Sequence, residues 1–411
     1  MTPRLASLLI ALALPLVSVH AEEPAPAKDS QPSGWRGNGQ GLNPDAAPPV
    51  EWSDEKNVKW IAELGTTGYA SPVVAGGRAF VVCEPNEVSG INLADGKVLW
   101  TINLEAADLP EAEREKLEKR VAEAGNAAPT PVCDGRSVYV VLNSGLVASL
   151  DHAGKKNWTT VVSQELTLEH GRSASPILVG DKLLVQMAHL VALDAKNGKP
   201  LWEAKDAAAT YGSPVAAKIG EVDVAVTPNG CLVRVADGKV LAKAIGVELT
   251  NTSPVVKDGV VYFAELEAKA VKLPDALKGD LADTKTLWEA ELDGETFASP
   301  LVHDGLLYSM NNYGVLHVLD AATGKEVYTK ETGIPVTAGG DKEANIYPSP
   351  TLAGKHILFS NDKGDLFVIE PGKEYKEVKR NALSSGAGGC PVPAGPRLLL
   401  RGEDCLYCVQ E

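Results

Sequence analysis

Short apolar runs separated by Gly, Asp and Asn turns follow one another along most of this chain. In one unit, Ser299-Pro300-Leu301-Val302 leads to a His-Asp-Gly turn, and an apolar run then extends from Leu306 to Met310. After an Asn-Asn-Tyr-Gly turn, a third run covers Val315 to Asp320 and ends before a Gly-Lys turn. Short apolar runs between turn residues predict β-strands joined by tight hairpins. The unit therefore predicts a four-stranded antiparallel meander.

The unit repeats, and each copy opens on a small residue followed by proline. Six of the eight openings have Ser before Pro, and successive openings are 38 to 59 residues apart, about the length of one propeller blade. The prolines are Pro72, Pro131, Pro176, Pro214, Pro254, Pro300, Pro350 and Pro391. Eight such units in 411 residues predict a modular, all-β fold.

A second landmark lies between consecutive prolines, as in Gly96-Lys97-Val98-Leu99-Trp100. Glycine suits a tight turn that needs a positive φ, and the aromatic residue can fill the space between neighbouring sheets. The other copies are Gly154 to Trp158, Gly198 to Trp202, Gly238 to Ala242, Thr284 to Trp288, Gly324 to Tyr328 and Gly372 to Lys376. Seven endings for eight openings leave the last unit one outer strand short.

The missing strand is predicted from the N-terminal part of the chain. Asn57 to Leu64 contains Trp60, which takes the aromatic position of the ending motif. Joining first and last segments in one sheet removes exposed strand edges. We therefore expect residues 34–411 to form an eight-bladed β-propeller of four-stranded antiparallel blades, closed by this N-terminal strand.

One long interval holds an insertion at about residues 108–125. Asp108 can cap a helix, Glu111 follows three residues later, and Gly125 can end it. Leu117, Val121 and Ala124 form a narrow apolar stripe. The pattern predicts a surface helix lying on the propeller. A smaller insertion lies near Leu273 to Asp283.

The N-terminus has the pattern of an export signal. In residues 1–21, Arg4 precedes an apolar run to about Val17, and Val19-His20-Ala21 offers a cleavage site. Residues 22–33 are rich in Pro, Ala and charge, which predicts a disordered tether. The first cysteine is Cys83, so we expect no lipid anchor at the cleavage point.

The charge and hydropathy of the chain disfavour some classes of binding partner. The formal net charge is −15 and is spread along the chain, which disfavours nucleic acid and anionic membrane surfaces as partners. No later apolar stretch approaches spanning length, so we expect no membrane segment after signal removal. The expected location is periplasmic or secreted.

Six cysteines remain in this oxidising setting, where disulfides are permitted but a core of this size does not require them. The possible full pairings number about 15 for six cysteines, and spacing does not choose among them. Cys405 and Cys408 form a C-x-x-C motif within an apolar run, whereas redox work needs such a pair at a helix start. We expect structural roles, as buried thiols or a disulfide.

The units resemble those of the PQQ-repeat, or quinoprotein-alcohol-dehydrogenase-like, propeller superfamily, which share the Ser-Pro opening and the Gly-Lys-x-x-Trp ending. The leading segment, Trp35-Arg36-Gly37-Asn38-Gly39 through Trp52, is similar to secreted bacterial members. The resemblance implies, for the enzymes, a quinone stacked between a tryptophan and a disulfide of adjacent cysteines, with calcium and an aspartate base. No two cysteines are adjacent here. We therefore expect neither PQQ nor calcium, no metal site and no catalytic residue.

Candidate binding residues lie in the loops before the Ser-Pro openings, because propellers usually bind ligands on the face that carries these loops. The candidates are Tyr69, His170, Arg172, Tyr211, Asn251, Phe297 and Tyr347. Turns on the same face contribute Glu84, Asn143, His189, Asn229, Asn312 and Asn361. These side chains either form a ligand funnel, or plug the channel and cap its loops.

Three functions fit this sequence. The favoured hypothesis is a non-enzymatic extracytoplasmic scaffold that binds a protein or small-molecule ligand of the envelope. The second is a role like that of the outer-membrane protein assembly propeller, and the third is a quinone-dependent dehydrogenase. A repeated fold supports many unrelated activities, so the repeats do not choose among these functions.

Overall fold

The computed structural model describes residues 33–117, 125–163, 171–336 and 344–411. The expected signal (1–21), all but one residue of the expected tether, part of the expected helix and His170 lie outside the described residues. In the described part of the chain, no helix combines the length and the apolar character needed to cross a bilayer.

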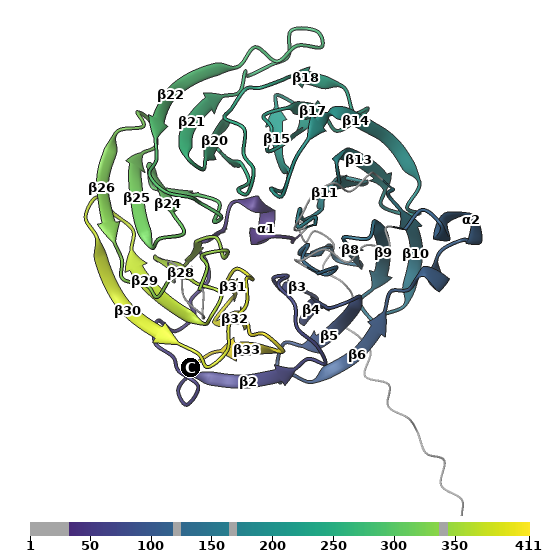
Figure 1. The fold of residues 1–411 in the computed structure, drawn as a ribbon, viewed down its shortest axis with the longest axis horizontal. Helices are drawn as coiled ribbons and strands as arrows, with labels where there is room; N and C mark the ends of the chain where they lie inside the picture. The colour runs from purple at the N-terminus through teal and green to yellow at the C-terminus, as the bar shows by residue number, and fades with distance from the viewer. Residues whose placement is uncertain (1–32, 118–124, 164–170, 337–343) are drawn as a thin grey trace, which may run out of the picture.

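Eight antiparallel sheets are arranged in a ring, as Figure 1 shows. Blade one contains β3 (Val73–Ala75), β4 (Arg78–Cys83), β5 (Glu87–Asn92) and β6 (Val98–Asn103), and blade two contains β7 (Val132–Cys133), β8 (Ser137–Val141), β9 (Leu146–Asp151) and β10 (Lys156–Val161). Blade three contains β11 (Ile177–Val179), β12 (Lys182–Gln186), β13 (His189–Asp194) and β14 (Pro200–Ala208), and blade four contains β15 (Val215–Ile219), β16 (Val222–Val226), β17 (Leu232–Arg234) and β18 (Val240–Ala242). Blade five contains β19 (Val255–Lys257), β20 (Val260–Ala264), β21 (Glu267–Lys272) and β22 (Lys285–Glu291), and blade six contains β23 (Leu301–His303), β24 (Leu306–Met310), β25 (Val315–Asp320) and β26 (Glu326–Glu331). Blade seven contains β27 (Thr351–Ala353), β28 (His356–Ser360), β29 (Asp365–Glu370) and β30 (Lys376–Ala382), and blade eight contains β31 (Val392–Ala394), β32 (Arg397–Arg401), β33 (Cys405–Val409) and β2 (Val58–Glu63). The prediction of an eight-bladed propeller is confirmed.

The ring closes where the sequence pattern placed the closure. Strand β2 pairs antiparallel with β33, with Trp60 opposite Cys408. An additional short strand, β1 (Leu42–Asn43), pairs parallel with β27 and extends blade seven to five strands. The N-terminal segment therefore contacts both of the last two blades.

The hydrophobic core is divided among the seams between blades. Among the described residues, buried apolar side chains form eight clusters, and each cluster joins two adjacent blades. In β4, Phe80 and Val82 face blade two, whereas Ala79 and Val81 face blade eight. Because successive strand residues face opposite sides, a middle strand with a blade on each side must be apolar at nearly every position. This packing explains the unbroken apolar runs.

A tryptophan on the outer strand locks each of five seams. The Trp158 Nε1–H donates to the Ala195 carbonyl of the next blade at 2.9 Å. A Cβ on Gly198, whose φ is +71°, would lie 2.4 Å from the Trp158 ring, so only glycine allows this approach. The other indole donors are Trp60 to Leu93, Trp100 to His152, Trp202 to Val235 and Trp288 to Ala321, at 2.8–3.3 Å. The Gly and Trp landmarks thus belong to one contact between neighbouring blades.

The seam between blades four and five lacks this lock, since Ala242 and Thr284 replace tryptophan and glycine together. The short insertion at 273–283 fills the seam instead. Leu273 and Ala282 join the cluster there, and the Ala282 N–H donates to the Leu241 carbonyl at 3.1 Å. The insertion therefore replaces the tryptophan as packing material.

The predicted helix at about 108–125 begins later than expected. A 3-10 turn, η1 (Ala106–Asp108), precedes α2 (Glu111–Arg114), and Pro110 occupies the N-cap. The prediction that Asp108 caps the helix is wrong, because the proline ring disfavours helical geometry at Leu109. The Asp108 carboxylate instead accepts the Glu105 N–H at 2.7 Å and pairs with Lys156 at 2.5 Å. Residues 118–124 lie outside the described chain.

Candidate functional site

A cavity of about 910 Å³ occupies the centre of the ring. Its wall is formed by the residues that precede the eight prolines, one from each blade. These residues are Ser71, Thr130, Ser175, Ser213, Ser253, Ser299, Ser349 and Cys390. Each of them is buried, with an exposed fraction of 2–5%.

These eight residues form a closed ring of hydrogen bonds. Each backbone N–H donates to the side chain of the corresponding residue in the next blade, at 2.8–3.2 Å. The ring closes where the Ser349 N–H donates to Cys390 Sγ and the Cys390 N–H donates to Ser71 Oγ. A short side chain with an acceptor atom is therefore required at each opening, which explains the Ser-Pro landmark.

The N-terminal segment crosses one end of the channel, where Figure 1 shows the short helix α1 (Arg36–Gly39) at the ring centre. It is fixed by contacts with several blades. Gln40 Nε2 donates to the Val256 carbonyl at 2.7 Å, and Ser33 exchanges two backbone hydrogen bonds with Cys133. Trp35 lines the cavity from this side. The segment therefore closes one end of the channel.

Five of the seven predicted site residues line the cavity together, and we call them the mouth residues. They are Tyr69, Tyr211, Asn251, Phe297 and Tyr347. Tyr69 and Tyr347 are 48% and 44% exposed, so this end of the cavity opens to solvent. Phe297 and Tyr347 stack with ring centroids 5.3 Å apart.

Aromatic side chains continue outward from the mouth. Gly388 lies between Tyr69 and Tyr347, since its Cβ position is 3.3 and 3.6 Å from their nearest atoms. On the other side, Tyr313 lies against Gly294 of the loop that carries Phe297, and Tyr313 is 57% exposed. We call Tyr69, Phe297, Tyr313 and Tyr347 the aromatic surface.

Of the other two predicted site residues, Arg172 is not among the described residues that line the cavity. Arg172 is 3% exposed, and its backbone N–H donates to Asn143 Oδ1 at 2.8 Å. His170 lies outside the described residues. The Arg172 side chain is therefore buried.

The polar turn residues on this face hold loops in place. The Glu84 carboxylate accepts the N–H groups of Asn126 and Ala127 at 2.8–3.0 Å. Asn312 Oδ1 accepts the Ile346 N–H at 2.8 Å, and Asn361 Nδ2 donates to the Pro335 carbonyl at 2.9 Å. Capping the loops is therefore an observed role of these side chains.

Charged residues around the mouth were not predicted from the sequence. Glu295, Asp362, Glu403 and Lys363 line the cavity, so acidic side chains outnumber basic ones in the described lining. Lys363 pairs with Asp362 at 3.6 Å. Buried Glu265 accepts the N–H groups of the loop 250–252 at 3.0–3.1 Å and so positions Asn251. Three carboxylates and one lysine thus accompany the aromatic side chains in the described lining.

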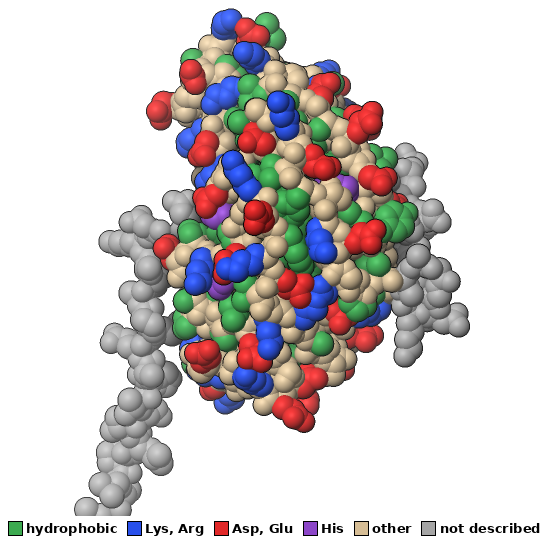
Figure 2. Space-filling view, turned by 90° about the vertical axis from the view of Figure 1, so that its left-hand side faces the viewer, with side chains coloured by type: hydrophobic (Ala, Val, Ile, Leu, Met, Phe, Trp, Pro, Cys, Tyr) green, Lys and Arg blue, Asp and Glu red, His purple; other side chains and the backbone are tan. Residues whose placement is uncertain are grey.

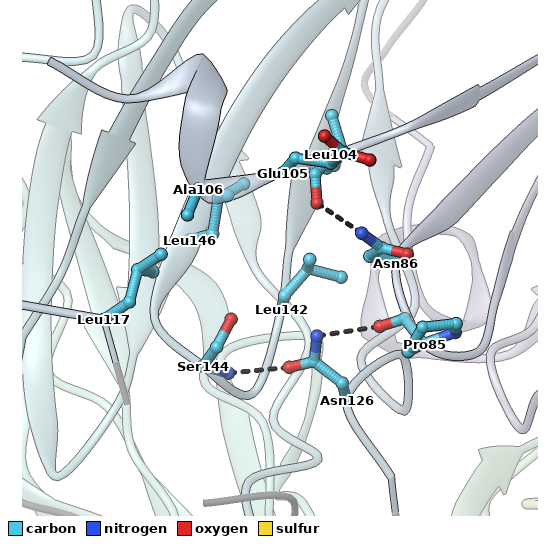
Figure 3. A pocket seen from close by; sticks show the side chains of 10 residues that line it. All are labelled: Pro85, Asn86, Leu104, Glu105, Ala106, Leu117, Asn126, Leu142, Ser144 and Leu146. Carbon is cyan, nitrogen blue, oxygen red and sulfur yellow. Dashed lines mark hydrogen bonds between the residues drawn. The ribbon is translucent and has the colours of Figure 1, made fainter. Parts of the chain in front are cut away.

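A second cavity, of about 290 Å³, lies between blades one and two beside residues 104–106 and Leu117, and Figure 3 shows its lining. Leucine side chains form its apolar wall, and its amide groups are engaged in structural contacts. Asn126 Nδ2 donates to the Pro85 carbonyl at 2.7 Å, and Asn126 Oδ1 accepts the Ser144 N–H at 2.8 Å. These amides support the loops and leave the central cavity as the candidate site.

Comparison with known proteins gives a consistent result. A family model described as outer membrane protein assembly factor BamB matches residues 58–279 and 231–373. The outer membrane protein assembly factor BamB of Moranella endobia is 25% identical over 321 residues, which are 76% of this chain and 64% of that protein. The chain thus spans under two thirds of that relative's length.

Solved structures also share the fold. The crystal structure of BamB from Moraxella catarrhalis aligns with a TM-score of 0.61 at 13% identity, covering 86% of this chain and 99% of that one. The quinohemoprotein alcohol dehydrogenase of Comamonas testosteroni aligns with a TM-score of 0.58 at 13% identity, covering 89% and 78%. At this identity the two structures establish the propeller architecture alone.

Proposed function

Because the chain belongs to the family of the outer membrane protein assembly factor BamB, we propose that it is a non-catalytic protein-interaction scaffold of the cell envelope. The observation that carries the proposal is the aromatic surface at the mouth of a rigid ring. Exposed aromatic side chains that lie together mark binding surfaces more often than isolated ones do. The finer role, in assembly of outer-membrane proteins, is proposed from the family.

The aromatic surface and its surrounding charges define the kind of partner. Exposed Tyr69, Tyr313 and Tyr347 offer apolar contact area, whereas Glu295 and Glu403 line the cavity. Charge complementarity raises association rates and selects partners. We propose that the face accepts a protein segment with apolar anchors flanked by Lys or Arg.

The rim of the ring offers a contrasting surface. Figure 2 shows acidic and basic side chains interspersed over the side formed by β22, β26 and β30. Many are paired, such as Lys269 with Glu289 at 2.9 Å and Arg380 with Glu377 at 2.8 Å. Exposed apolar residues of the rim, including Leu99 and Leu287, lie on separate blades. The rim therefore supplies matched control positions.

Affinity capture from the source envelope tests this proposal. The double variant Tyr69→Ala and Tyr347→Ala should lose most of the captured partner, because truncating central aromatic anchors costs about 2 kcal/mol or more each. The double variant Leu99→Ala and Leu287→Ala removes similarly exposed side chains from the rim and should keep it. Equal recovery of the same partner by both variants would place the interaction elsewhere on the molecule.

The alternative function is a quinone-dependent dehydrogenase, whose fold this chain shares. Its cofactor requirements are not matched by the residues of the cavity. One cysteine, Cys390, is among the described residues of the lining, and no group of three His, Cys, Asp or Glu suited to a metal occurs in the described part of the chain. We therefore propose that the ring works without quinone or calcium. Dye-linked turnover of an alcohol or sugar after adding PQQ and calcium would instead establish the dehydrogenase.

We also propose that the protein is exported to the periplasm. The family and the signal pattern in residues 1–21 support export to the periplasm. N-terminal sequencing of the protein from its source should recover a start at or near Glu22, whereas an intact Met1 would contradict export by this signal.

A further inference from the structure

The hydroxyl groups of the hydrogen-bonded ring line the central cavity with donors. Each of the seven oxygens accepts one backbone N–H, as Ser213 Oγ accepts from Ser175 at 2.8 Å. A hydroxyl group also carries one proton that it can donate. Among the described residues, no hydrogen bond uses the proton of any of these seven groups. The cavity wall therefore offers hydroxyl donors to a ligand.

Two carboxylates of the same lining offer acceptors. Glu295, between β22 and β23, and Glu403, between β32 and β33, are exposed. In the described part of the chain, neither side chain has a hydrogen bond or an ion pair. Asp362 differs, because it accepts the Asn345 N–H at 2.8 Å and pairs with Lys363 at 3.6 Å. The cavity thus combines unused donors with unused acceptors.

Aromatic rings supply apolar surface at both ends of the cavity. Trp35 lines it at the closed end, where the Arg36 guanidinium lies 5.3 Å from the ring centroid and donates to the Pro350 carbonyl at 2.9 Å. At the mouth, Phe297 and Tyr347 stack with centroids 5.3 Å apart. Rings that are held in place before a ligand arrives contribute contact area at a low cost in entropy.

These groups together disfavour three classes of ligand. An anion would meet three carboxylates and one lysine in the described lining. An apolar ligand would displace water from the hydroxyl groups and leave their donors unpaired, which is costly. An organic cation suits the carboxylates and the rings, but it offers no acceptor to the hydroxyl protons. The ligand must therefore donate, accept and present an apolar face without carrying a negative charge.

We propose that the central cavity binds a small neutral saccharide of one or two sugar rings. Each sugar hydroxyl donates and accepts, so a saccharide pairs with the hydroxyl ring and with the free carboxylates at once. Its C–H faces pack against the electron-rich faces of aromatic side chains. The volume of about 910 Å³ lies within the range of roughly 300–1,000 Å³ found for small-molecule sites. This binding does not depend on the protein partner proposed above.

Isothermal titration of the purified mature protein tests the class of ligand. The probes are the neutral disaccharides maltose, cellobiose, lactose and N,N′-diacetylchitobiose. We expect saturable binding of at least one of them, with a Kd of about 1 mM or lower. Glucuronate, an anion, and putrescine, a diamine, should not displace the bound sugar. No binding of any of the four disaccharides, or displacement by either charged probe, would overturn the proposal.

The free carboxylates provide the first pair of variants. The double variant Glu295→Gln and Glu403→Gln should weaken sugar binding by about fivefold or more, because neutral amides replace charged acceptors. Both side chains are exposed and lack partners in the described chain, so the melting temperature should not change. The control, Glu63→Gln with Glu291→Gln, alters two exposed carboxylates of the outer strands β2 and β22. Equal affinities of the two double variants would contradict the assignment.

A second pair of variants separates the saccharide from the protein partner. Trp35→Leu removes the ring at the closed end and should weaken sugar binding by about tenfold or more. Tyr313→Leu alters the aromatic surface at a residue outside the cavity lining, so it should keep the sugar affinity. Loss of sugar binding in Tyr313→Leu, or full affinity in Trp35→Leu, would place the saccharide outside the cavity and overturn the proposal.

Discussion

One residue at the start of each blade takes part in two hydrogen bonds of this ring, one through its side chain and one through its backbone N–H. Ser253 Oγ accepts the Ser213 N–H at 2.8 Å, and the Ser253 N–H donates to Ser299 Oγ at the same distance. The proline that follows fixes the chain direction without needing a donor of its own. Eight such hydrogen bonds, each between neighbouring blades, thus hold the blades at a common radius around the cavity.

Removing one acceptor from the ring should destabilise the whole propeller. Ser253→Ala leaves the Ser213 N–H without its partner, which costs about 1–3 kcal/mol when the donor is buried. Ser253→Thr keeps the acceptor, and Thr130 already occupies an equivalent place, so this variant should retain most of the stability. Urea unfolding followed by tryptophan fluorescence measures both. Identical stability of Ser253→Ala and the parent protein would exclude a structural role for the ring.

Local sequence predicted some of these residues and missed others for physical reasons. The Ser-Pro and Gly-Trp landmarks could be found because each contact recurs in successive blades. The way the N-terminal segment closes the channel could not be predicted, because Arg36 donates to the carbonyl of Pro350, which is 314 positions away in the sequence. The depth of Arg172 also depends on packing from another blade. The prediction that Asp108 caps the helix was wrong because Pro110 disfavours helical geometry at the residue before it.

At the scale of elements, the blades are alike in pairing but differ in how their seams are closed. Five seams use a tryptophan and one uses the 273–283 insertion. The seam between blades seven and eight contains Trp52, which is 3% exposed and whose backbone N–H donates to Asn381 Oδ1 at 3.0 Å. The leading segment therefore supplies packing in a seam where Lys376 of blade seven takes the place of the tryptophan.

Truncation tests this role of the N-terminal segment. A chain starting at residue 65 lacks β2, Trp52 and Trp60, and should lose at least about 5 kcal/mol of stability, because truncating one buried tryptophan costs about 3–5 kcal/mol. A chain starting at residue 33 keeps the Ser33 pairing with Cys133 and should melt like the full mature protein. Calorimetry distinguishes them, and equal melting temperatures would refute closure by β2.

At the scale of the whole molecule, the ring has two unequal ends. The segment containing Trp35 and Arg36 closes one end, while the mouth residues leave the other open to solvent. The paired charges of the rim and the aromatic surface around the mouth give the molecule one distinct face. A rigid ring with one such face is suited to holding a partner in a fixed orientation.

Site-specific photo-cross-linking in the source cell tests the scaffold role most directly. A benzophenone amino acid replaces Tyr347 at the mouth in one strain and Leu287 on the rim in another, two positions with exposed fractions of 44% and 41%. We predict a discrete cross-linked protein from position 347, competed by a peptide carrying Lys or Arg beside apolar residues, and none from position 287. Cross-links from 287 with none from 347 would contradict the account.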